Sequence, residues 1–234
     1  MKIFTPKKVI ALAVFVVIFV LLFVVLPLSL GSIVKFGAER LGKKTLQADL
    51  VLGKVYISPL SGSALISDLS IGNPKGFGRG DALYAPEISV KMKPMAIFKK
   101  TIEVNRVVIK SPAINYIESG RKWSNIDQLQ KNAESPSGDD KKSDGKKFVI
   151  KTLIIQAPTV RWYPDIPGHK AITIKLSDII INDVGEGGSV DTTKIIAMIL
   201  KKMLPSIHKN ILKEMGKGKI QGIGHGIKDL FRKK

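Results

Sequence analysis

IEVNRVVIKSPAINYIES, residues 102–119, recurs as FVIKTLIIQAPTVRWYPD at residues 148–165, with a constant offset of 46 residues (148 − 102). Apolar positions match apolar positions, and each copy has one proline between two runs of β-branched and aromatic residues. Such runs predict strands, and a proline, which cannot donate a backbone hydrogen bond, predicts the end of each first strand. The chain therefore repeats a strand–proline–strand unit, which indicates a sheet that grows by accretion. A weaker third copy ends at Pro74.

The sequence around the repeat predicts further strands at residues 48–58, 65–71, 83–93 and 170–182. The third of these alternates most regularly, with Ile88, Val90 and Met92 on one face and polar or charged residues on the other, as in a half-buried strand. In the first copy of the repeat the apolar period changes phase, which predicts a bulge near Asn105 and Arg106. Bulges bend sheets, so we expect an α+β fold with a curved, mainly antiparallel, groove-like sheet.

Two helices are predicted after the first repeat. Residues 124–132, SNIDQLQKN, predict a short helix with Ser124 or Asn125 as its N-cap. Residues 193–215 place apolar side chains at steps of three or four residues with lysines between them, which predicts a basic amphipathic helix kinked by Pro205. The remainder, up to residue 234, has an amphipathic pattern but many glycines, so residues 193–234 form a basic amphipathic C-terminal region.

Two further segments are expected to lack stable structure of their own. Residues 133–147 have no apolar residue after Ala133, which predicts a flexible loop, and their aspartates lack the spacing of a calcium loop. Residues 32–43 are weakly amphipathic, and their two glycines argue against a helix that is stable by itself.

The N-terminal region contains the most apolar segment of the chain. Residues 9–30, VIALAVFVVIFVLLFVVLPLSL, carry no charge, and about 20 apolar residues span a bilayer, so they predict a transmembrane anchor after a tail at residues 1–8. A cleaved signal peptide is the alternative, but its apolar core is shorter and its cleavage site has small residues, which residues 29–33 match poorly. Basic residues flank both sides almost equally. We expect the short tail to stay cytoplasmic and the β-rich domain, residues 31–192, to cross the membrane.

The chain is strongly basic, with 38 Lys and Arg against 19 Asp and Glu and a formal charge of +19. This charge favours partners that bear phosphate, either nucleic acid or anionic lipid. Only 6% of the residues are aromatic, too few for the stacking platforms of a single-strand binder. Trp123, Trp162, Tyr116 and Tyr163 are instead expected to pack on the sheet, and no nucleic-acid partner is predicted.

Side chains that carry catalysis are not found in a recognisable arrangement. His169, His208 and His225 have no second ligand at metal-binding spacing and are expected on the surface. Paired carboxylates, a nucleophile elbow and a phosphate loop are not apparent, and the chain has no cysteine. We therefore predict a protein that is not an enzyme and takes no metal or cofactor.

The motifs around the repeat occur in an order that resembles a known family. These are LSIGNPKGF, ALYAPEISV, TIEVNRVVIKSPAINYIE and SNIDQL, at residues 69–77, 82–90, 101–118 and 124–129. Together with the single N-terminal anchor they resemble the N-terminal region of AsmA-like proteins, which are similar to the repeating β-groove family that includes TamB and the bridge-like lipid carriers. The resemblance implies a single-pass protein of a bacterial inner membrane, with its β-rich domain in the periplasm and phospholipid acyl chains held in a β-groove.

The resemblance also implies a role in lipid transport or outer-membrane homeostasis. Seven to nine strands spaced about 4.8 Å apart give a sheet roughly 35–40 Å wide, which does not reach across a periplasm. We therefore expect a lipid-binding module or a partner of a longer envelope lipid-transport protein. Three alternatives remain open: an assembly factor that binds another envelope protein through its sheet edge or C-terminal helix, a closed domain without ligand, and a LEA-like β-sandwich.

Two sets of side chains are candidates for lipid contact. The apolar set lines the predicted groove: Ile88, Val90, Met92, Val107, Ile109, Leu153, Ile155, Ile172, Ile174 and Leu176. The basic set is expected at an anionic membrane surface: Lys201, Lys202, Lys209, Lys213, Arg232, Lys233 and Lys234. An apolar sheet face suits an acyl chain and a covering helix equally well, so the pattern leaves open whether residues 193–215 fill the groove.

Overall fold

The computed structural model describes residues 14, 26–78, 80–119, 123–135, 146–165, 170–185, 188 and 190–216. Ten strands form one curved sheet, accompanied by helices α2 (Leu26–Leu46), α3 (Asn125–Glu134) and α4 (Thr192–Gly216) and the short helix η2 (Ala96–Phe98). The strands are β1 (Leu50–Val51), β2 (Val55–Ser58), β3 (Ser63–Gly72), β4 (Asp81–Met92), β5 (Thr101–Lys110), β6 (Ala113–Ile117), β7 (Lys147–Gln156), β8 (Thr159–Tyr163), β9 (Ile172–Lys175) and β10 (Ile179–Val184). The α+β class and the mainly antiparallel, curved sheet are therefore confirmed.

The two copies of the repeat lie side by side in register. β5 pairs with β7 in parallel, with Ile109 opposite Ile155, and β6 pairs with β8 in parallel, with Tyr116 opposite Trp162. Each paired residue of the first copy thus faces the residue 46 positions later. Of the nine pairings between described strands, these two are parallel and seven are antiparallel.

The weak third copy is not a structural repeat. Leu69 and Ile71, which align with Val107 and Ile109, lie beyond a left-handed residue, Asp68, in a strand that pairs antiparallel with β4. In the true copies the equivalent residues come before the interruption. Apolar alternation alone does not distinguish these cases, because it reports the face of a strand and not the place at which the strand is interrupted.

One line of interruptions crosses the whole sheet, and we call it the break line. It comprises Gly53, Asp68, Pro86, Ser111–Pro112, Ala157–Pro158 and residues 176–178. Neighbouring members face one another: the Gly53 amide donates to the Asp68 carbonyl, the Ser111 amide to the Gln156 carbonyl, and the Leu176 amide to the Pro158 carbonyl. β4 continues through the line, but there its partner changes from β6 to β5.

The break line divides the sheet into two halves. The near half, beside the start of α2, contains β2, β5, β7, β10 and the adjoining parts of β3 and β4; the far half contains β1, β6, β8 and β9 with the rest of those two strands. The predicted bulge is confirmed in the near half, where Lys91 faces Arg106 and Met92 faces Val104, leaving Asn105 unmatched.

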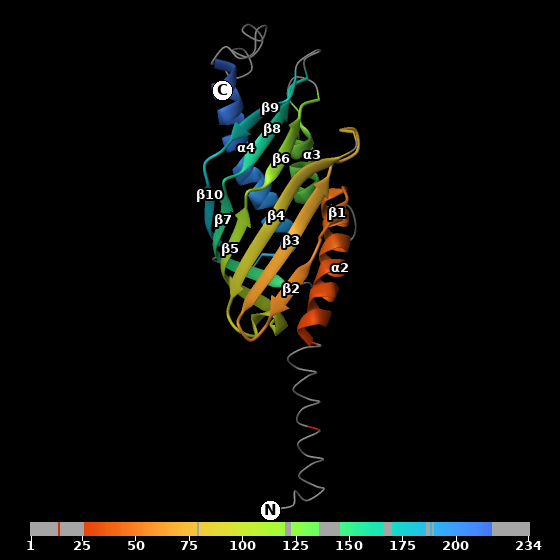
Figure 1. The fold of residues 1–234 in the computed structure, drawn as a ribbon, viewed down its shortest axis with the longest axis vertical. Helices are drawn as coiled ribbons and strands as arrows, with labels where there is room; N and C mark the ends of the chain where they lie inside the picture. Colours follow the sequence, from red (N-terminus) through yellow and green to blue (C-terminus); the bar gives the residue numbers. More distant parts are fainter. Residues whose placement is uncertain are drawn as a thin grey trace, which may run out of the picture.

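Helices cover one face and one edge of the sheet. α3 and α4 lie together against one face, the inner face, while α2 runs along the edge made by β1 and β2 (Figure 1). Ser124 caps α3 as expected, because its hydroxyl accepts a hydrogen bond from the Asp127 amide at 3.1 Å. α4 confirms the predicted amphipathic helix and contains Pro205.

The segment after the predicted anchor is part of helix α2, which is held by contacts with the sheet edge rather than being stable by itself. Gly31 is buried so closely against β2 that an added Cβ would lie 2.1 Å from the Val55 carbonyl oxygen. The Lys35 ammonium donates a hydrogen bond to the Gly53 carbonyl, and the Glu39 carboxylate accepts one from the Leu52 amide. Tertiary contact with the sheet edge therefore outweighs the low helix propensity of glycine.

Within the described residues no helix is long and apolar enough to cross a membrane. Most of the predicted anchor, residues 9–30, lies outside those residues, as do residues 1–8 of the tail and residues 217–234 of the C-terminal region. The predicted loop at 133–147 begins later than expected, because α3 extends to Glu134, and β7 begins at Lys147; residues 136–145 lie outside the described part.

Candidate functional site

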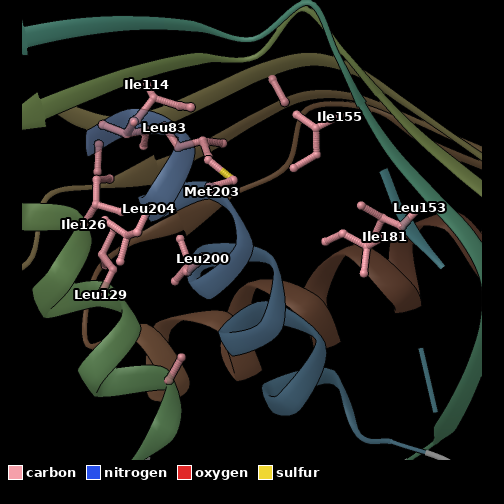
Figure 2. Close-up of a cluster of buried hydrophobic side chains, with 14 of the residues drawn as sticks. Leu83, Ile114, Ile126, Leu129, Leu153, Ile155, Ile181, Leu200, Met203 and Leu204 are labelled. Carbon is pink, nitrogen blue, oxygen red and sulfur yellow. The ribbon is translucent and has the colours of Figure 1, made fainter. Parts of the chain in front are cut away.

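The inner face of the far half is closed by two helices. Leu83 and Ile114 of the sheet meet Ile126 and Leu129 of α3 and the middle of α4, where Met203 and Leu204 are buried (Figure 2). Leu200, Met203, Leu204, Ile207 and Ile211 form the buried stripe of α4. Their spacing of three or four residues puts them on one side of the helix, which is the side that faces the sheet.

Polar contacts fix these helices to the far half. The Tyr116 hydroxyl lies 2.8 Å from Nε2 of His208, which joins β6 to α4. The buried Asn132 side chain donates to the Leu46 carbonyl at 2.7 Å, which joins α3 to the end of α2. His208 is thus half-buried and engaged, and its predicted place on the surface is wrong; His169 and His225 lie outside the described residues.

Three of the motifs behind the family resemblance meet at one buried side chain. Asn125 accepts a hydrogen bond from the Ile117 amide at 2.9 Å and donates to the Asn115 carbonyl at 2.7 Å and to Oδ1 of Asn73 at 2.8 Å. The asparagine–proline turn, the strand after the break line and α3 are therefore tied together. The sequence suggested Asn125 only as a possible N-cap of the helix. The signal available for its buried role was a polar residue directly after the capping Ser124.

The four aromatic residues expected to pack on the sheet differ in their exposure to solvent. Trp162 and Tyr116 are buried in the core and Tyr163 is half-buried in β8, as expected, but Trp123 is 39% exposed in the loop before α3. The ammonium of Lys131 lies 5.7 Å from the centre of the Trp123 ring, a distance typical of a cation–π contact. Burial raises the pKa of the Tyr116 hydroxyl, so this group keeps its proton in the core.

In the near half the inner face is covered unevenly. Leu153, Ile155 and Ile181, on β7 and β10, are buried, and Figure 2 shows them on the sheet beside α4. The neighbouring strands β3, β4 and β5 carry an apolar set that is only partly buried, which we call the open strip: Ala64, Ile66, Val90, Val107 and Ile109. These residues share the inner face, because Ala64, Val90 and Val107 face one another across the three strands.

The first turns of α4 have the same half-buried, apolar character. Residues 195–199, IIAMI, are consecutive, and all five side chains are partly buried. Five consecutive helical residues point around the whole helix, so this segment presents apolar surface on every side. The open strip and residues 195–199 together are the candidate functional site.

The ten predicted groove residues all belong to the core or pack against it. Six are buried, namely Ile88, Met92, Leu153, Ile155, Ile174 and Leu176; four are half-buried, namely Val90, Val107, Ile109 and Ile172. Helix α4 lies on this face, and its buried stripe belongs to the same core cluster as Leu153 and Ile155. Three of the half-buried residues, Val90, Val107 and Ile109, belong to the open strip.

The basic candidates on α4 are exposed. Lys201 and Lys202 face solvent, and Lys209 and Lys213 line an open cavity of about 850 Å³. The rest of its lining is Leu176, Ser177, Asp178, Ser206, Asn210 and Leu212. Arg232, Lys233 and Lys234 lie outside the described residues. Within the described part of the chain, no cluster of three histidine or carboxylate side chains could hold a metal ion.

Comparisons with family models, with curated proteins and with solved structures found no match to this chain. The likeness to AsmA-like proteins therefore stays a prediction that rests on the four motifs, their order and the predicted N-terminal anchor.

Proposed function

We propose that this protein is a membrane-tethered, non-catalytic lipid-binding module. Acyl chains of a phospholipid lie along the open strip, and the headgroup remains in water. Residues 9–30 hold the domain on a bacterial inner membrane, with the tail in the cytoplasm and the domain in the periplasm. In this position the module supports lipid transport or outer-membrane homeostasis, alone or beside a longer lipid-transport protein.

One observation carries the proposal: the inner face of the sheet and the first turns of α4 both keep apolar surface that is only half-buried. The open strip lies on the inner face of the sheet, and residues 195–199 of α4 are apolar all round yet none of them is fully buried. Removing a CH₂ group from water contributes about 0.8 kcal/mol of favourable free energy, so burial of a lipid tail against these apolar side chains would be favourable. A helix that leaves the strip half covered is also easier to displace than one with a complete core contact.

The size of the sheet limits the role. The broken strands occupy six positions across the sheet, since β1 and β2, β5 and β6, β7 and β8, and β9 and β10 each share one. At about 4.8 Å between strands this gives a width of roughly 25–30 Å, smaller than the sequence suggested. The domain is therefore suited to receiving or handing over a lipid at the membrane rather than to bridging an envelope.

Photo-crosslinking in membranes tests the proposal. A diazirine amino acid replaces Val107 on the inner face or, as a matched control, Val108, which is equally half-buried but faces outward. We expect mass spectrometry to recover phospholipid attached at position 107 and much less at 108. Equal labelling at both positions, or none at 107, would refute lipid binding on the open strip.

A second candidate function follows from the sheet edge that β9 and β10 form within the described residues. β9 and β10 end the strand order, whereas α2 runs along the opposite edge. Exposed edge strands can add a strand from another protein, and Ile180 on β10 is 59% exposed. This edge suits an assembly factor that binds another envelope protein. Crosslinking from Ile180 in membranes should then yield one defined protein adduct, and a spread of unrelated adducts would count against this role.

A further inference from the structure

Three chain segments that are distant in sequence form the end of the domain at which α2 begins. They are the β2–β3 turn at residues 59–62, the β4–β5 connection at residues 93–100, and the start of β7. The Met95 amide donates to the Pro59 carbonyl at 2.9 Å, and the Lys147 amide donates to the Lys100 carbonyl at 3.0 Å. Figure 1 shows the turn and the connection at the same end as the start of α2. We call this end the rim.

Large apolar side chains are exposed on the rim. Leu60 is 58% exposed, Met95 is 48% exposed and Phe98 is 48% exposed. Met95 also has a left-handed backbone, with φ of 59°, and caps η2, so the connection holds these side chains outward while Ala96 is buried. An aromatic and two aliphatic side chains gathered at one end are unusual on a surface that only meets water.

Exposed lysines lie in the same chain segments as these apolar side chains. Lys93, Lys99, Lys100, Lys146 and Lys147 are exposed and lie in the same segments. Glu103 forms an ion pair with Lys93. The Asp191 carboxylate accepts a hydrogen bond from the Lys194 amide at the start of α4. Lys146 donates to the Lys99 carbonyl at 2.7 Å, which uses one of its three protons and leaves its charge at the rim. The rim thus combines apolar side chains with a net positive charge.

The chain itself brings this end to a membrane. The uncharged sequence of residues 9–25 runs directly into α2, which begins at Leu26 on the rim side, because Gly31 packs on Val55 and β2 ends at the 59–62 turn. We propose that the rim is a membrane-docking surface for anionic phospholipid. Leu60, Met95 and Phe98 enter the interface, and Lys99, Lys100, Lys146 and Lys147 bind headgroup phosphates.

Docking fixes how the domain sits on the bilayer. The near half of the sheet, with the open strip, faces the membrane, and the C-terminal end of α4, with Lys209 and Lys213, points away at the opposite end (Figure 1). The membrane-binding lysines are therefore those of the rim and not those that the α4 pattern suggested. This inference rests on the tether in the proposed function and is independent of lipid uptake.

Environment-sensitive labels on single cysteines test the docking, because the chain has no cysteine of its own. The full-length protein is reconstituted in bilayers of neutral lipid with or without anionic lipid, and NBD is attached at Phe98→Cys or Met95→Cys. Lys75→Cys, in the β3–β4 turn at the other end, is the control, and Val14→Cys reports the tether. We expect nitroxide-labelled lipids to quench positions 98 and 95 in anionic bilayers and to leave position 75 unquenched.

The lysines provide a second measurement on the same samples. Replacing Lys99 and Lys100 by glutamine should lower the docked-to-undocked ratio by roughly fivefold per lysine at low salt, because each lysine contributes about 1 kcal/mol of attraction to anionic headgroups. High salt should have the same effect on the parent protein.

The outcomes separate the two proposals. The docking is overturned if lipid quenching at position 98 only equals that at position 75. It is also overturned if position 98 is shielded from water without lipid quenching, which would indicate that protein covers it. Both conclusions hold whatever position 14 reports. Absence of quenching at position 14 overturns the tether of the proposed function, and the crosslinking at Val107 judges lipid uptake separately.

Discussion

Ser111 and Ala157 directly follow the paired ends of β5 and β7, each directly before a proline and each in the left-handed conformation, with φ of 45° and 46°. Non-glycine residues adopt this conformation at a cost of about 1–2 kcal/mol, because Cβ crowds the backbone. The repeat therefore copies a strained backbone position together with its proline, and both copies lie on the break line.

Ala157→Gly tests whether the strain at the break line is real. Glycine removes the Cβ penalty, so we expect stability unchanged or raised by up to about 1 kcal/mol. The matched control is Ala113→Gly, in strand β6 without a positive φ, which should lower stability by about 0.5–1 kcal/mol. Urea unfolding followed by tryptophan fluorescence measures both. Equal losses in the two variants would show that position 157 is not strained.

A second pair of variants tests the contact between α2 and the sheet. Gly31→Ala drives a methyl group into the Val55 carbonyl and should destabilise the domain by about 1–3 kcal/mol. Gly37→Ala, on the same helix with nothing near its Cβ, should stabilise it by about 0.5–1 kcal/mol through helix propensity. Thermal melting distinguishes the two, and a stabilising effect at both positions would mean that α2 does not pack on β2 as described.

The hydrogen bond between Tyr116 and His208 should stabilise α4 on the far half. Tyr116→Phe removes the hydroxyl and leaves a half-buried imidazole nitrogen without this partner, so we expect a loss of about 0.5–1.5 kcal/mol. Tyr56→Phe, at an exposed position of β2, is the control and should change stability very little. Faster hydrogen exchange in α4, seen only in the first variant, would locate the effect.

Glu118 should make stability depend on pH. Burial is the main cause that raises the pKa of this carboxyl; the negative charges of Asp165 and Asp127 raise it further, whereas the nearby Trp162 side chain and Asp165 backbone lower it. The folded state therefore binds a proton more tightly than the unfolded state, so the penalty for the charge is absent below the unfolded pKa and grows as pH rises through the folded pKa. Glu118→Gln should be more stable than the parent at pH 7, by less than about 1 kcal/mol because the group is partly solvated. Denaturation from about pH 4 to pH 7 should show the two proteins converge toward the acid end; a constant difference would argue against a buried charge.

A disulfide between α2 and α4 tests whether α4 must move for lipid to enter. The hydroxyl oxygens of Thr45 and Thr193 are 3.4 Å apart, so Thr45→Cys with Thr193→Cys should oxidise without large backbone movement. The oxidised protein is expected to lose most lipid crosslinking at Val107, and reduction should restore it. Each single cysteine variant is a control. Undiminished crosslinking in the oxidised form would mean that lipid reaches the strip with α4 in place.

Several parts of this structure could be predicted because their signals are local or repeated. The offset of 46 residues named the pairs that lie opposite each other, the change of phase located the bulge at Asn105, and the serine before Asn125 marked the start of α3. Each of these depends on a few neighbouring residues or on the match between two copies.

Other parts could not be predicted, because they arise between segments far apart in the chain. Alternation does not show that the copies pair in parallel, and only their contact with each other does so. Helix α2 depends on Gly31 meeting Val55, which no propensity reports. The candidate site was predicted as a face, but the pattern did not show which residues of that face are buried, as Leu153 is, and which stay half-buried, as Val90 and Val107 do.

The register between β5 and β7 also bears on how such a domain could change in size. Two copies pair without stagger, and β10 pairs with the backbone of the second copy. A tandem duplication of 46 codons would therefore insert one more strand of about 4.8 Å in width and leave each existing pair of neighbours compatible. Each such duplication would widen the sheet by one strand position and leave the two edges of the sheet unchanged.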